Sequence, residues 1–307
     1  GDARPRDVFK RLSIAGDDAR RSTAGHARYD VRSEQRDRRS FALLNDFGAA
    51  IEAADQLSLV YQPRVDLATG ERRGVEALLR WSHPELGSIP PGEFVPLVEQ
   101  TALARPMTEW VIEEAIRQSR QWAASGLHLP VSINASALNL DEADFAERLL
   151  AAAHRGGVPA SRLELEFTES AIARDPSRVA DQLLALRSAG VAIAIDDFGT
   201  GYSNLSYLQK LPITVLKIDQ SFVRNIGDSG KDRLLVKTMI LMGHDLGYRV
   251  VAEGIETRPA YETLADWGCD EGQGYLMSRP VSAGVVQQPW GWLANEQVTT
   301  TNDARTA

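Results

Sequence analysis

Hydrophobic and polar residues follow two distinct rhythms from residue 41 onward. Short apolar runs rich in β-branched residues are typical of buried strands, and the stretches between them carry the longer apolar period that predicts helices. Predicted strands span residues 57–65, 74–81, 130–134, 163–168, 191–196, 214–218 and 249–252, with a short one near Cys269. Predicted helices include residues 107–125, 141–154, 177–189, 231–246 and 259–267.

This repeat predicts an α/β fold. A (β/α)8 barrel of the TIM type is favoured over an open doubly wound sheet, because about 250 residues hold eight strand candidates with helices between them. Glycines follow four predicted helices, where a left-handed C-terminal cap favours a residue without Cβ; these are Gly126, Gly190, Gly247 and Gly268. Only residues 68–73 separate the first two strands, which is too short for a parallel crossover. We therefore expect the first strand to be antiparallel to its neighbour.

Residues 1–40 differ from the rest of the chain. They are rich in arginine, punctuated by Gly, Ser and Asp, and contain one weak helical stretch at residues 7–21. We interpret them as a linker or the remnant of a preceding domain, residues 41–296 as the folded domain, and residues 297–307 as a flexible tail. The first residue is Gly rather than Met, which predicts that the chain was cut from a longer protein.

Composition narrows the class of protein. Of 307 residues, 43% are hydrophobic and 25% are charged, as in ordinary soluble domains. No apolar run reaches the roughly 18 residues of a membrane span, and the N-terminal sequence lacks the apolar stretch of a signal peptide. The single cysteine, Cys269, cannot form an internal disulfide, which fits a reducing compartment. A cytoplasmic domain is expected, and a membrane anchor in the full-length parent stays open.

Charge is spread unevenly along the chain. The net charge is −8, from 34 basic and 42 acidic residues, but residues 1–40 hold 11 basic and 7 acidic ones. The remainder therefore carries 23 basic against 35 acidic residues, a charge of −12. A domain with this negative charge is a poor partner for DNA or RNA polymers, because proteins bind them mostly through Lys and Arg side chains that contact the phosphates. If the domain binds phosphate, a cation should mediate the contact.

Side chains that can bind a cation stand at the carboxyl ends of the predicted strands, where barrel enzymes gather their catalytic groups. They are Glu76, Asn134, Glu166, Asp196, Asp197 and Glu253, with Lys217 among them. Asn134, Glu166 and Asp196 are spaced by 32 and 30 residues, and one strand–helix unit is roughly 30 residues long. Six oxygen-bearing side chains without His or Cys indicate a hard cation such as Mg²⁺ or Mn²⁺ rather than zinc.

Structural roles stay open for several of these side chains. Asp196 could cap the helix that follows it, with Asp197 in solvent. Arg80 shares a strand face with Glu76, and it suits either a bound anion or an ordinary ion pair. Lys217 lies in an apolar strand and needs a partner there, either a water bound to a metal or the acidic half of a salt bridge. The five histidines are scattered without ligand spacing.

Several longer motifs occur together and in a characteristic order. They are Glu76-Ala77-Leu78 within YQPRVDLATGERRGVEALLRW, then LELEFTES, IAIDDFGTGYSNLSYLQKLPITVLKIDQSFV, VVAEGIET and GCDEGQGYLMSRP. Over residues 41–285 the chain thus resembles the EAL-domain family of phosphodiesterases that hydrolyse cyclic di-GMP. The preceding DVFKRLSIAGDDARR and RYD resemble the end of a GGDEF diguanylate cyclase domain, so a tandem GGDEF-EAL parent is expected.

The resemblance implies two Mg²⁺ or Mn²⁺ ions at the mouth of the barrel. One ion would be bound by Glu76, Asn134, Glu166 and Asp196, and the other by Asp196, Asp197 and Glu253. Lys217 would position or deprotonate the water that attacks a phosphodiester of cyclic di-GMP in line, and the product would be linear 5′-pGpG. Calcium, which is larger and more flexibly coordinated than magnesium, is expected to bind without supporting catalysis and so to inhibit.

The resemblance also assigns supporting roles. The residues expected to contact the substrate are Gln62, Leu78 and Arg80, and those expected to orient ligands, waters or the loop at residues 199–210 are Glu169, Asp219, Glu256 and Gln273. Because this family couples that loop to its dimer interface, a homodimer is expected. Ala135, Leu138 and Gln220 depart from the usual family residues, but none is an expected ligand. An active enzyme is predicted; the alternatives are an inactive cyclic di-GMP receptor and a protein-interaction module.

Overall fold

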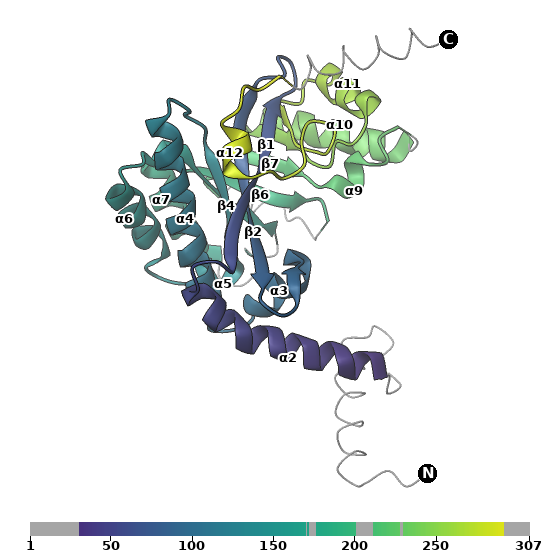
Figure 1. The fold of residues 1–307 in the computed structure, drawn as a ribbon. Coiled ribbons are helices and arrows are strands. Elements are labelled where there is room, and N and C mark those ends of the chain that lie inside the picture. Colours follow the sequence, from purple (N-terminus) through teal and green to yellow (C-terminus); the bar gives the residue numbers. More distant parts are fainter. Residues whose placement is uncertain (1–30, 170, 172–175, 201–210, 228–229, 292–307) are drawn as a thin grey trace.

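Eight strands close into a barrel in a computed structural model that describes residues 31–169, 171, 176–200, 211–227 and 230–291 (Figure 1). The barrel strands are β1 (Leu57–Asp66), β2 (Arg72–His83), β4 (Val131–Asn134), β5 (Leu163–Thr168), β6 (Ala192–Phe198), β7 (Val215–Ile218), β8 (Arg249–Ala252) and β9 (Glu271–Gly272). Their order is β1-β9-β8-β7-β6-β5-β4-β2, and β1 also pairs with β2, which closes the ring. The predicted α/β barrel is therefore confirmed.

The first strand runs against its neighbours. It pairs antiparallel with β2 in a hairpin that places Gln62 opposite Glu76, and antiparallel with β9 on its other side. All other neighbouring barrel strands are parallel. The prediction of an antiparallel first strand is confirmed. A ninth strand, β3 (Gly87–Ile89), extends the sheet by pairing antiparallel with the end of β2, outside the ring.

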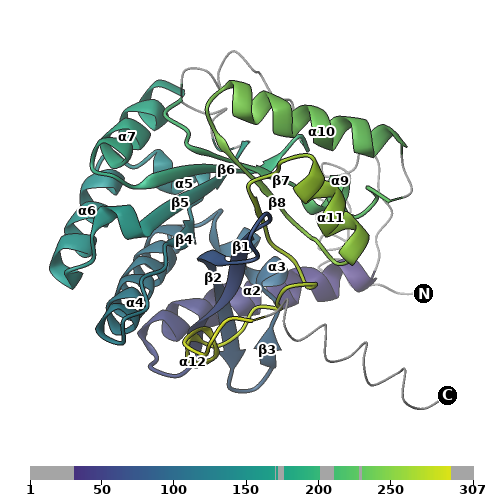
Figure 2. The ribbon, with the colours of Figure 1, turned by 90° about the horizontal axis from the view of Figure 1, so that it is seen from above.

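The helices cover the outside of the barrel (Figure 2). All five predicted helices form, with bounds that move by four residues or fewer: α4 (Ala104–Ala124), α6 (Phe145–Gly156), α7 (Pro176–Ser188), α10 (Gly230–Asp245) and α11 (Arg258–Asp266). Gly126, Gly190, Gly247 and Gly268 all adopt positive φ, as a left-handed helix cap requires. Shorter helices, which the sequence pattern did not predict, are α3 (Pro91–Val98), α5 (Ala137–Leu140), η1 (Ala160–Arg162), α9 (Gln220–Val223) and α12 (Ala283–Val286).

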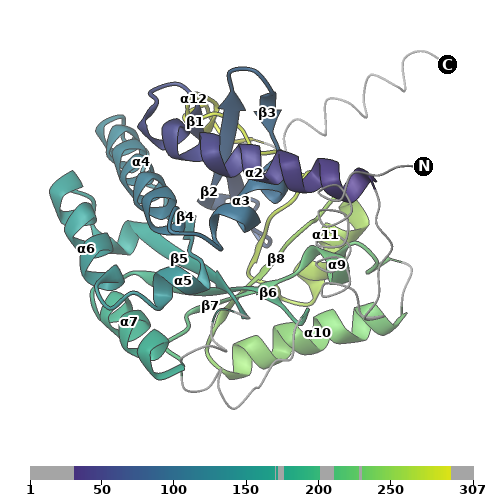
Figure 3. The same cartoon turned by 90° about the horizontal axis from the view of Figure 1, so that it is seen from below.

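A long helix that the sequence pattern also did not predict, α2 (Val31–Glu52), lies on one side of the barrel, where it runs past β2 and α3 (Figures 1 and 3). It is held by buried Leu43, Phe47 and Ala50, whose spacing of four and three residues places them on one face. Phe47 packs against Trp81 and Phe94, with ring centroids 5.2 and 5.4 Å away. The helix begins before the domain boundary predicted at residue 41. The predicted stretches at residues 7–21 and 297–307 lie outside the described residues, and the domain limits stay predictions.

The apolar core lies between the strands and the outer helices, whereas the interior of the barrel is largely polar. A small apolar cluster of Ala194, Val215 and Val251 is separate from the main core. In ordinary barrels the interior is filled by branched apolar side chains. Here buried charged residues occupy it, and burial of charge is costly unless partners are supplied. Among the described residues, no helix is both long and apolar enough to span a bilayer.

Candidate metal site

Six strands bring their polar residues to one end of the barrel. Glu76 lies on β2, Asn134 ends β4, Glu166 lies on β5, Asp196 and Asp197 lie on β6, Lys217 lies on β7 and Glu253 follows β8. The parallel register pairs Asn134 with Glu166 and Thr168 with Asp196, and the Glu253 backbone amide donates to the Ile218 carbonyl at 3.0 Å. Because side chains alternate along each strand, these residues point into the same interior space, with Asp197 as the exception. Asp197 directly follows Asp196, and the alternation is broken there by an irregular register of β6 between Ile195 and Phe198.

Lys217 stands at the centre of the acidic residues. Its side chain is fully buried, and its Nζ lies 2.5 Å from Glu166 Oε2, 2.7 Å from Glu253 Oε1 and 3.2 Å from Asp196 Oδ1. Burial alone would lower the pKa of this ammonium, but the surrounding carboxylates outweigh burial and raise the pKa well above its usual value. Lys217 therefore carries its proton in this state. The salt bridge that we considered as its structural role is present, and it is shared among three acids.

One ammonium does not balance the acids around it. Burial raises the pKa of Glu166 well above its usual value, helped by the negative charges of Glu76 and Asp196 against the opposing charge of Lys217. Burial likewise raises the pKa of Glu253 to about 8, again with Asp196 and Glu76 adding to the effect. Neighbouring buried carboxylates that resist joint ionisation mark a candidate functional site, and a further positive charge would favour their ionised forms.

The adjacent acids on β6 adopt an unusual backbone conformation. Asp197 has a φ of 54°, and it is the one non-glycine residue with positive φ in the described part of the chain. A left-handed conformation is costly for such a residue, so the turn is held by its surroundings. Carboxylate oxygens of Asp196, Asp197 and Glu253 all lie within 4.8 Å of one another. Asp197 is half-buried rather than in solvent, and burial together with the charges of Asp196 and Asp219 raises its pKa.

Amide side chains hold Glu76 on the opposite side of the cluster. Asn134 Nδ2 donates to Glu76 Oε1 at 2.9 Å, and Gln273 Nε2 donates to Glu76 Oε2 at 2.6 Å. Gln273 also donates to Gln62 Oε1 at 3.1 Å, and Gln62 in turn donates to the Ser278 carbonyl. Burial opposes ionisation of Glu76, but Lys217 and these amides outweigh it and lower its pKa. Glu76 is thus held in place by two amides, and its environment favours the ionised carboxylate.

The donor set fits a hard divalent cation. Carboxylates and an amide oxygen are the donors that Mg²⁺ and Mn²⁺ prefer. Glu166 Oε1 is buried without a hydrogen-bond partner, and so is Gln273 Oε1. Buried oxygens of this kind are usually satisfied. The cation nearest to Glu166 Oε1 is Arg64, at 3.6 Å and beyond hydrogen-bond distance, so the cluster holds more acceptor oxygens than its own donors satisfy and has room for a further cation.

A cavity of about 230 Å³ opens over the acidic cluster. Of the predicted residues, those that line it are Gln62, Glu76, Leu78, Asp196, Glu253, Glu256 and Gln273. Glu166 and Lys217 lie buried beneath, and Asp219 is buried as the cap of α9, where it accepts from the Ser221 amide. Gln220, Arg224 and Tyr275 also line the cavity, although they carried no predicted role. The cavity therefore joins the acidic cluster to polar and aromatic groups.

Three predicted residues occupy less central positions. Arg80 is not among the residues that line the cavity, and its guanidinium donates to the neighbouring Leu79 carbonyl at 2.9 Å. Glu256 is exposed and pairs with Arg224 at 3.1 Å. Glu169 lies half-buried just after β5, but most of the loop that it is expected to brace, residues 201–210, falls outside the described residues.

A second set of charged residues inside the barrel was missed by the sequence analysis. Arg64 on β1, Glu164 on β5 and Glu271 on β9 are all buried, one layer further from the cavity. A signal existed in the sequence: Arg64 and Glu164 each stand two residues from a candidate, Gln62 and Glu166, and so share its strand face. Charged residues on the same face of apolar strands indicate an ionic layer inside the barrel.

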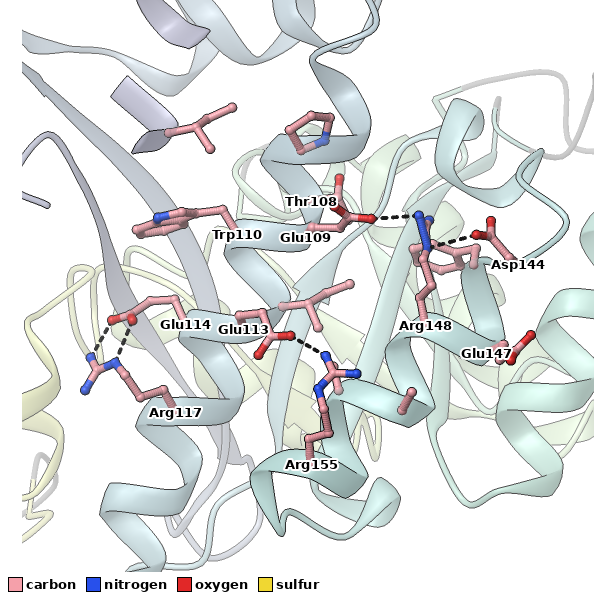
Figure 4. Close-up of a pocket in the computed structure, with 16 residues that line it drawn as sticks. Thr108, Glu109, Trp110, Glu113, Glu114, Arg117, Asp144, Glu147, Arg148 and Arg155 are labelled. Atoms are coloured by element: carbon pink, nitrogen blue, oxygen red, sulfur yellow. Dashed lines mark hydrogen bonds and ion pairs between the residues drawn. The ribbon is translucent and has the colours of Figure 1, made fainter. Parts of the chain in front are cut away.

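A larger cavity lies outside the barrel, between α4 and α6 (Figure 4). Its volume is about 930 Å³, and its walls carry several acids and arginines. Four of its five acids are paired with arginines of the same wall; for example, Arg148 Nη1 lies 2.8 Å from Glu109 Oε1, and Arg155 Nη2 lies 2.6 Å from Glu113 Oε1. Because these acids are paired and lie away from the carboxyl ends of the strands, we assign the chemistry to the smaller cavity.

Known proteins resemble this chain over most of its length. The family model of the EAL domain matches residues 44–280. A cyclic di-GMP phosphodiesterase of Pseudomonas aeruginosa is 48% identical over 287 residues, which make up 94% of this chain and 48% of that protein. From the same species, the bifunctional diguanylate cyclase/cyclic di-GMP phosphodiesterase MucR is 43% identical over 78% of this chain and 35% of that protein.

A solved structure has the same fold. The PaMucR phosphodiesterase in its c-di-GMP complex aligns with a TM-score of 0.76 and 42% identity, over 80% of this chain and 99% of that one. The chain spans about half, or less, of the length of the two curated relatives.

Proposed function

The chain belongs to the EAL domain family, and from this premise we propose that it is a phosphodiesterase that hydrolyses cyclic di-GMP. The observation that carries the proposal is the acidic cluster beneath the cavity, in which Glu76, Glu166, Asp196 and Glu253 surround a single ammonium. The names of two similar proteins include cyclic di-GMP phosphodiesterase, and a similar solved structure holds c-di-GMP.

The ligands fall into two groups that share one residue. Glu76, Asn134, Glu166 and Asp196 would hold one divalent cation, and Asp196, Asp197 and Glu253 would hold a second. Two divalent cations bound in this way lower the pKa of a water and stabilise charge during in-line displacement at phosphorus. The close approach of the Asp196, Asp197 and Glu253 oxygens supports the second group. Mg²⁺ and Mn²⁺ are the proposed ions.

Lys217 would hold the attacking water. Its ammonium is protonated, and its three N–H donors face three acids. If those carboxylates turn to bind cations, an N–H is released that would donate a hydrogen bond to a water at the cluster. When cations bind those carboxylates, Lys217 would lose its contacts with them. Its pKa would then fall, because the carboxylates are the groups that raise it. Lys217 could then accept a proton from that water. Attack on one phosphodiester would release the ribose 3′ oxygen and leave linear 5′-pGpG.

The substrate would enter the cavity over the cluster. Gln62 and Leu78 lie on its wall and would contact the nucleotide, and Arg80 would turn from the Leu79 carbonyl toward a phosphate. Gln273 fixes both Gln62 and Glu76 by hydrogen bonds, which supports its role in orienting the site. Asp219 would act through Asp197, and Glu256 and Glu169 would support the rim and the loop after β6.

A homodimer remains part of the proposal. Leu234 and Leu241 on α10 are 67% and 55% exposed, and Leu184 on α7 is 56% exposed. Figure 2 shows α7 and α10 on the same side of the barrel. Exposed leucines seven residues apart on one helix face favour contact with another apolar surface. Sedimentation of Leu234→Glu and Leu241→Glu variants would test it, with monomers expected.

A nucleotide product assay tests the proposed function. Purified protein with Mg²⁺ or Mn²⁺ is mixed with cyclic di-GMP, and the products are separated by chromatography. Linear pGpG that appears only with a divalent metal supports the proposal. Binding of cyclic di-GMP without turnover in either metal would indicate an inactive receptor, and absence of binding under every metal condition would indicate a protein-interaction module.

A further inference from the structure

Beneath the acidic cluster, a guanidinium is enclosed inside the barrel. The Arg64 side chain is 1% exposed, and its Nη1 is hydrogen-bonded to Glu164 Oε1. Its Nε lies 3.6 Å from Glu271 Oε2. A charge buried this deeply is costly unless acids surround it, and here strands β5 and β9 supply them.

The same guanidinium reaches one of the proposed metal ligands. Arg64 Nη1 lies 3.6 Å from Glu166 Oε1, the oxygen that has no hydrogen-bond partner. The other oxygen, Oε2, faces Lys217 at 2.5 Å. Glu166 therefore lies between two cations, with Arg64 on the side away from the cavity.

The backbone leaves Arg64 little room to move. A Cβ atom added at Gly74, which stands opposite Arg64 on β2, would lie 3.0 Å from Arg64 Nη2 and 3.2 Å from the Pro130 carbonyl oxygen. Both contacts are tighter than ordinary van der Waals distance. Gly74 therefore provides the space in which the guanidinium lies against β5.

Arg249 provides a natural comparison. Its Nη2 lies 2.7 Å from Glu164 Oε2 and its Nε lies 3.1 Å from Glu271 Oε1, so it shares both acidic partners with Arg64. The ion pairs of Arg249 do not include Glu166, and its side chain is 41% exposed. If these arginines only stabilised the ionic layer, both would have the same role. Arg64 differs from Arg249 because it also contacts Glu166, the proposed metal ligand.

We propose that Arg64 is a positioning residue that fixes the Glu166 carboxylate from beneath, so that Glu166 presents an oxygen to a divalent cation at the mouth. The inference rests on the proposed function, because it takes Glu166 as a metal ligand. It adds that the metal site depends on a buried guanidinium which does not touch metal or substrate.

Direct metal binding tests the proposal apart from activity. Mn²⁺ is titrated into metal-free wild type, Arg64→Met, Arg64→Lys and Arg249→Met, with the affinity read by calorimetry and by the spin-resonance signal of free Mn²⁺. Arg64→Met should weaken Mn²⁺ binding by about 10-fold or more, as loss of a group that orients a ligand typically does. Arg249→Met should lower thermal stability and change Mn²⁺ affinity by less than about threefold, and Arg64→Lys should recover part of the loss.

Steady-state kinetics and a second variant complete the test. kcat should fall in Arg64→Met while KM for cyclic di-GMP changes little. Gly74→Ala keeps every charge but crowds the guanidinium, so it should also weaken Mn²⁺ binding, and it serves if Arg64→Met does not fold. Two outcomes would overturn this inference and leave the proposed function standing. One is an equal loss of Mn²⁺ affinity in Arg64→Met and Arg249→Met, and the other is unchanged Mn²⁺ binding in both Arg64→Met and Gly74→Ala. A wild type that binds no Mn²⁺ would overturn the proposed function as well.

Discussion

Two ionic regions fill the same barrel and differ in how their charges balance. At the mouth, Glu76, Glu166, Asp196 and Glu253 surround one cation, Lys217. In the layer beneath, which we call the floor, Arg64 and Arg249 face Glu164 and Glu271, two charges of each sign. The mouth carries excess negative charge, whereas the floor is neutral.

The pKa values of two glutamates show what this difference does. Burial opposes ionisation of Glu164, but the charge and hydrogen bond of Arg64 and the charge of Arg249 outweigh it and lower its pKa to about 2. Glu253 at the mouth shares Lys217 with other acids, so burial prevails and raises its pKa to about 8. The same kind of side chain is thus satisfied in one layer and short of positive charge in the other. The floor suits a structural role, and the mouth suits a bound cation.

Removal of a shared ligand should have the largest effect. Asp196→Asn takes the carboxylate that both proposed ions use, so we expect pGpG formation to fall at least about 100-fold and the number of bound Mn²⁺ ions to drop. Glu262→Gln on the exposed face of α11 is the control, with activity unchanged. A crystal of Asp196→Asn with two bound metals would contradict the bridging role.

Replacement of Lys217, the one cationic side chain in the acidic cluster at the mouth, should have the second-largest effect. Lys217→Met should reduce turnover by about 100-fold while cyclic di-GMP binding is largely kept, because its proposed role is in the chemical step. Without metal, the variant should also lose about 3–5 kcal/mol of unfolding free energy, since buried acids are left without their partner.

Added Mn²⁺ should recover much of that stability, which would be measured by denaturant unfolding with and without metal. Lys237→Met, at an exposed position on α10, is the matched control. Preserved turnover in Lys217→Met would show that the assigned role is wrong.

Exchange of the metal probes the geometry of the mouth. Ca²⁺ takes more ligands at longer distances than Mg²⁺, so it should bind the carboxylates without holding water and phosphate in the reactive geometry. We expect Ca²⁺ to compete with Mg²⁺ in calorimetry and to suppress pGpG formation in the product assay. Rapid hydrolysis with Ca²⁺ as the only divalent ion would contradict this prediction.

A smaller effect should come from acid titration of the floor. The Glu164 pKa of about 2 in the folded protein lies below its value of about 4.3 in an unfolded chain. Its ionisation therefore contributes stability above about pH 4, and this contribution is lost as pH falls toward 2. Urea unfolding of wild type should weaken across this range by about 3 kcal/mol more than unfolding of Glu164→Gln. Parallel pH curves for the two proteins would show that the floor does not stabilise by charge.

The local pattern of hydrophobic and polar residues was sufficient to predict the barrel strands and most of the long helices. The predicted strand 163–168 has the same limits as β5, and that at 249–252 has the same limits as β8. Apolar runs of this kind are local properties, and so are the glycine caps. The helix α2 was missed because its first ten residues are mostly polar, although Leu43 and Phe47 marked a buried face. The strand β3 has three residues and α3 contains Pro96, so neither gives a strong periodic signal.

The sequence by itself determined the order of strands and helices and placed acids at the carboxyl ends of strands, because these depend on residue type and spacing along one segment. Only the tertiary structure decided that Lys217 meets Glu166, Asp196 and Glu253, and that Arg64 lies under Glu166. Such partners come from strands distant in sequence, and they meet only when the ring closes in a particular register. Periodicity within one strand does not encode that register, so the balance of charge in each layer becomes visible only in the folded barrel.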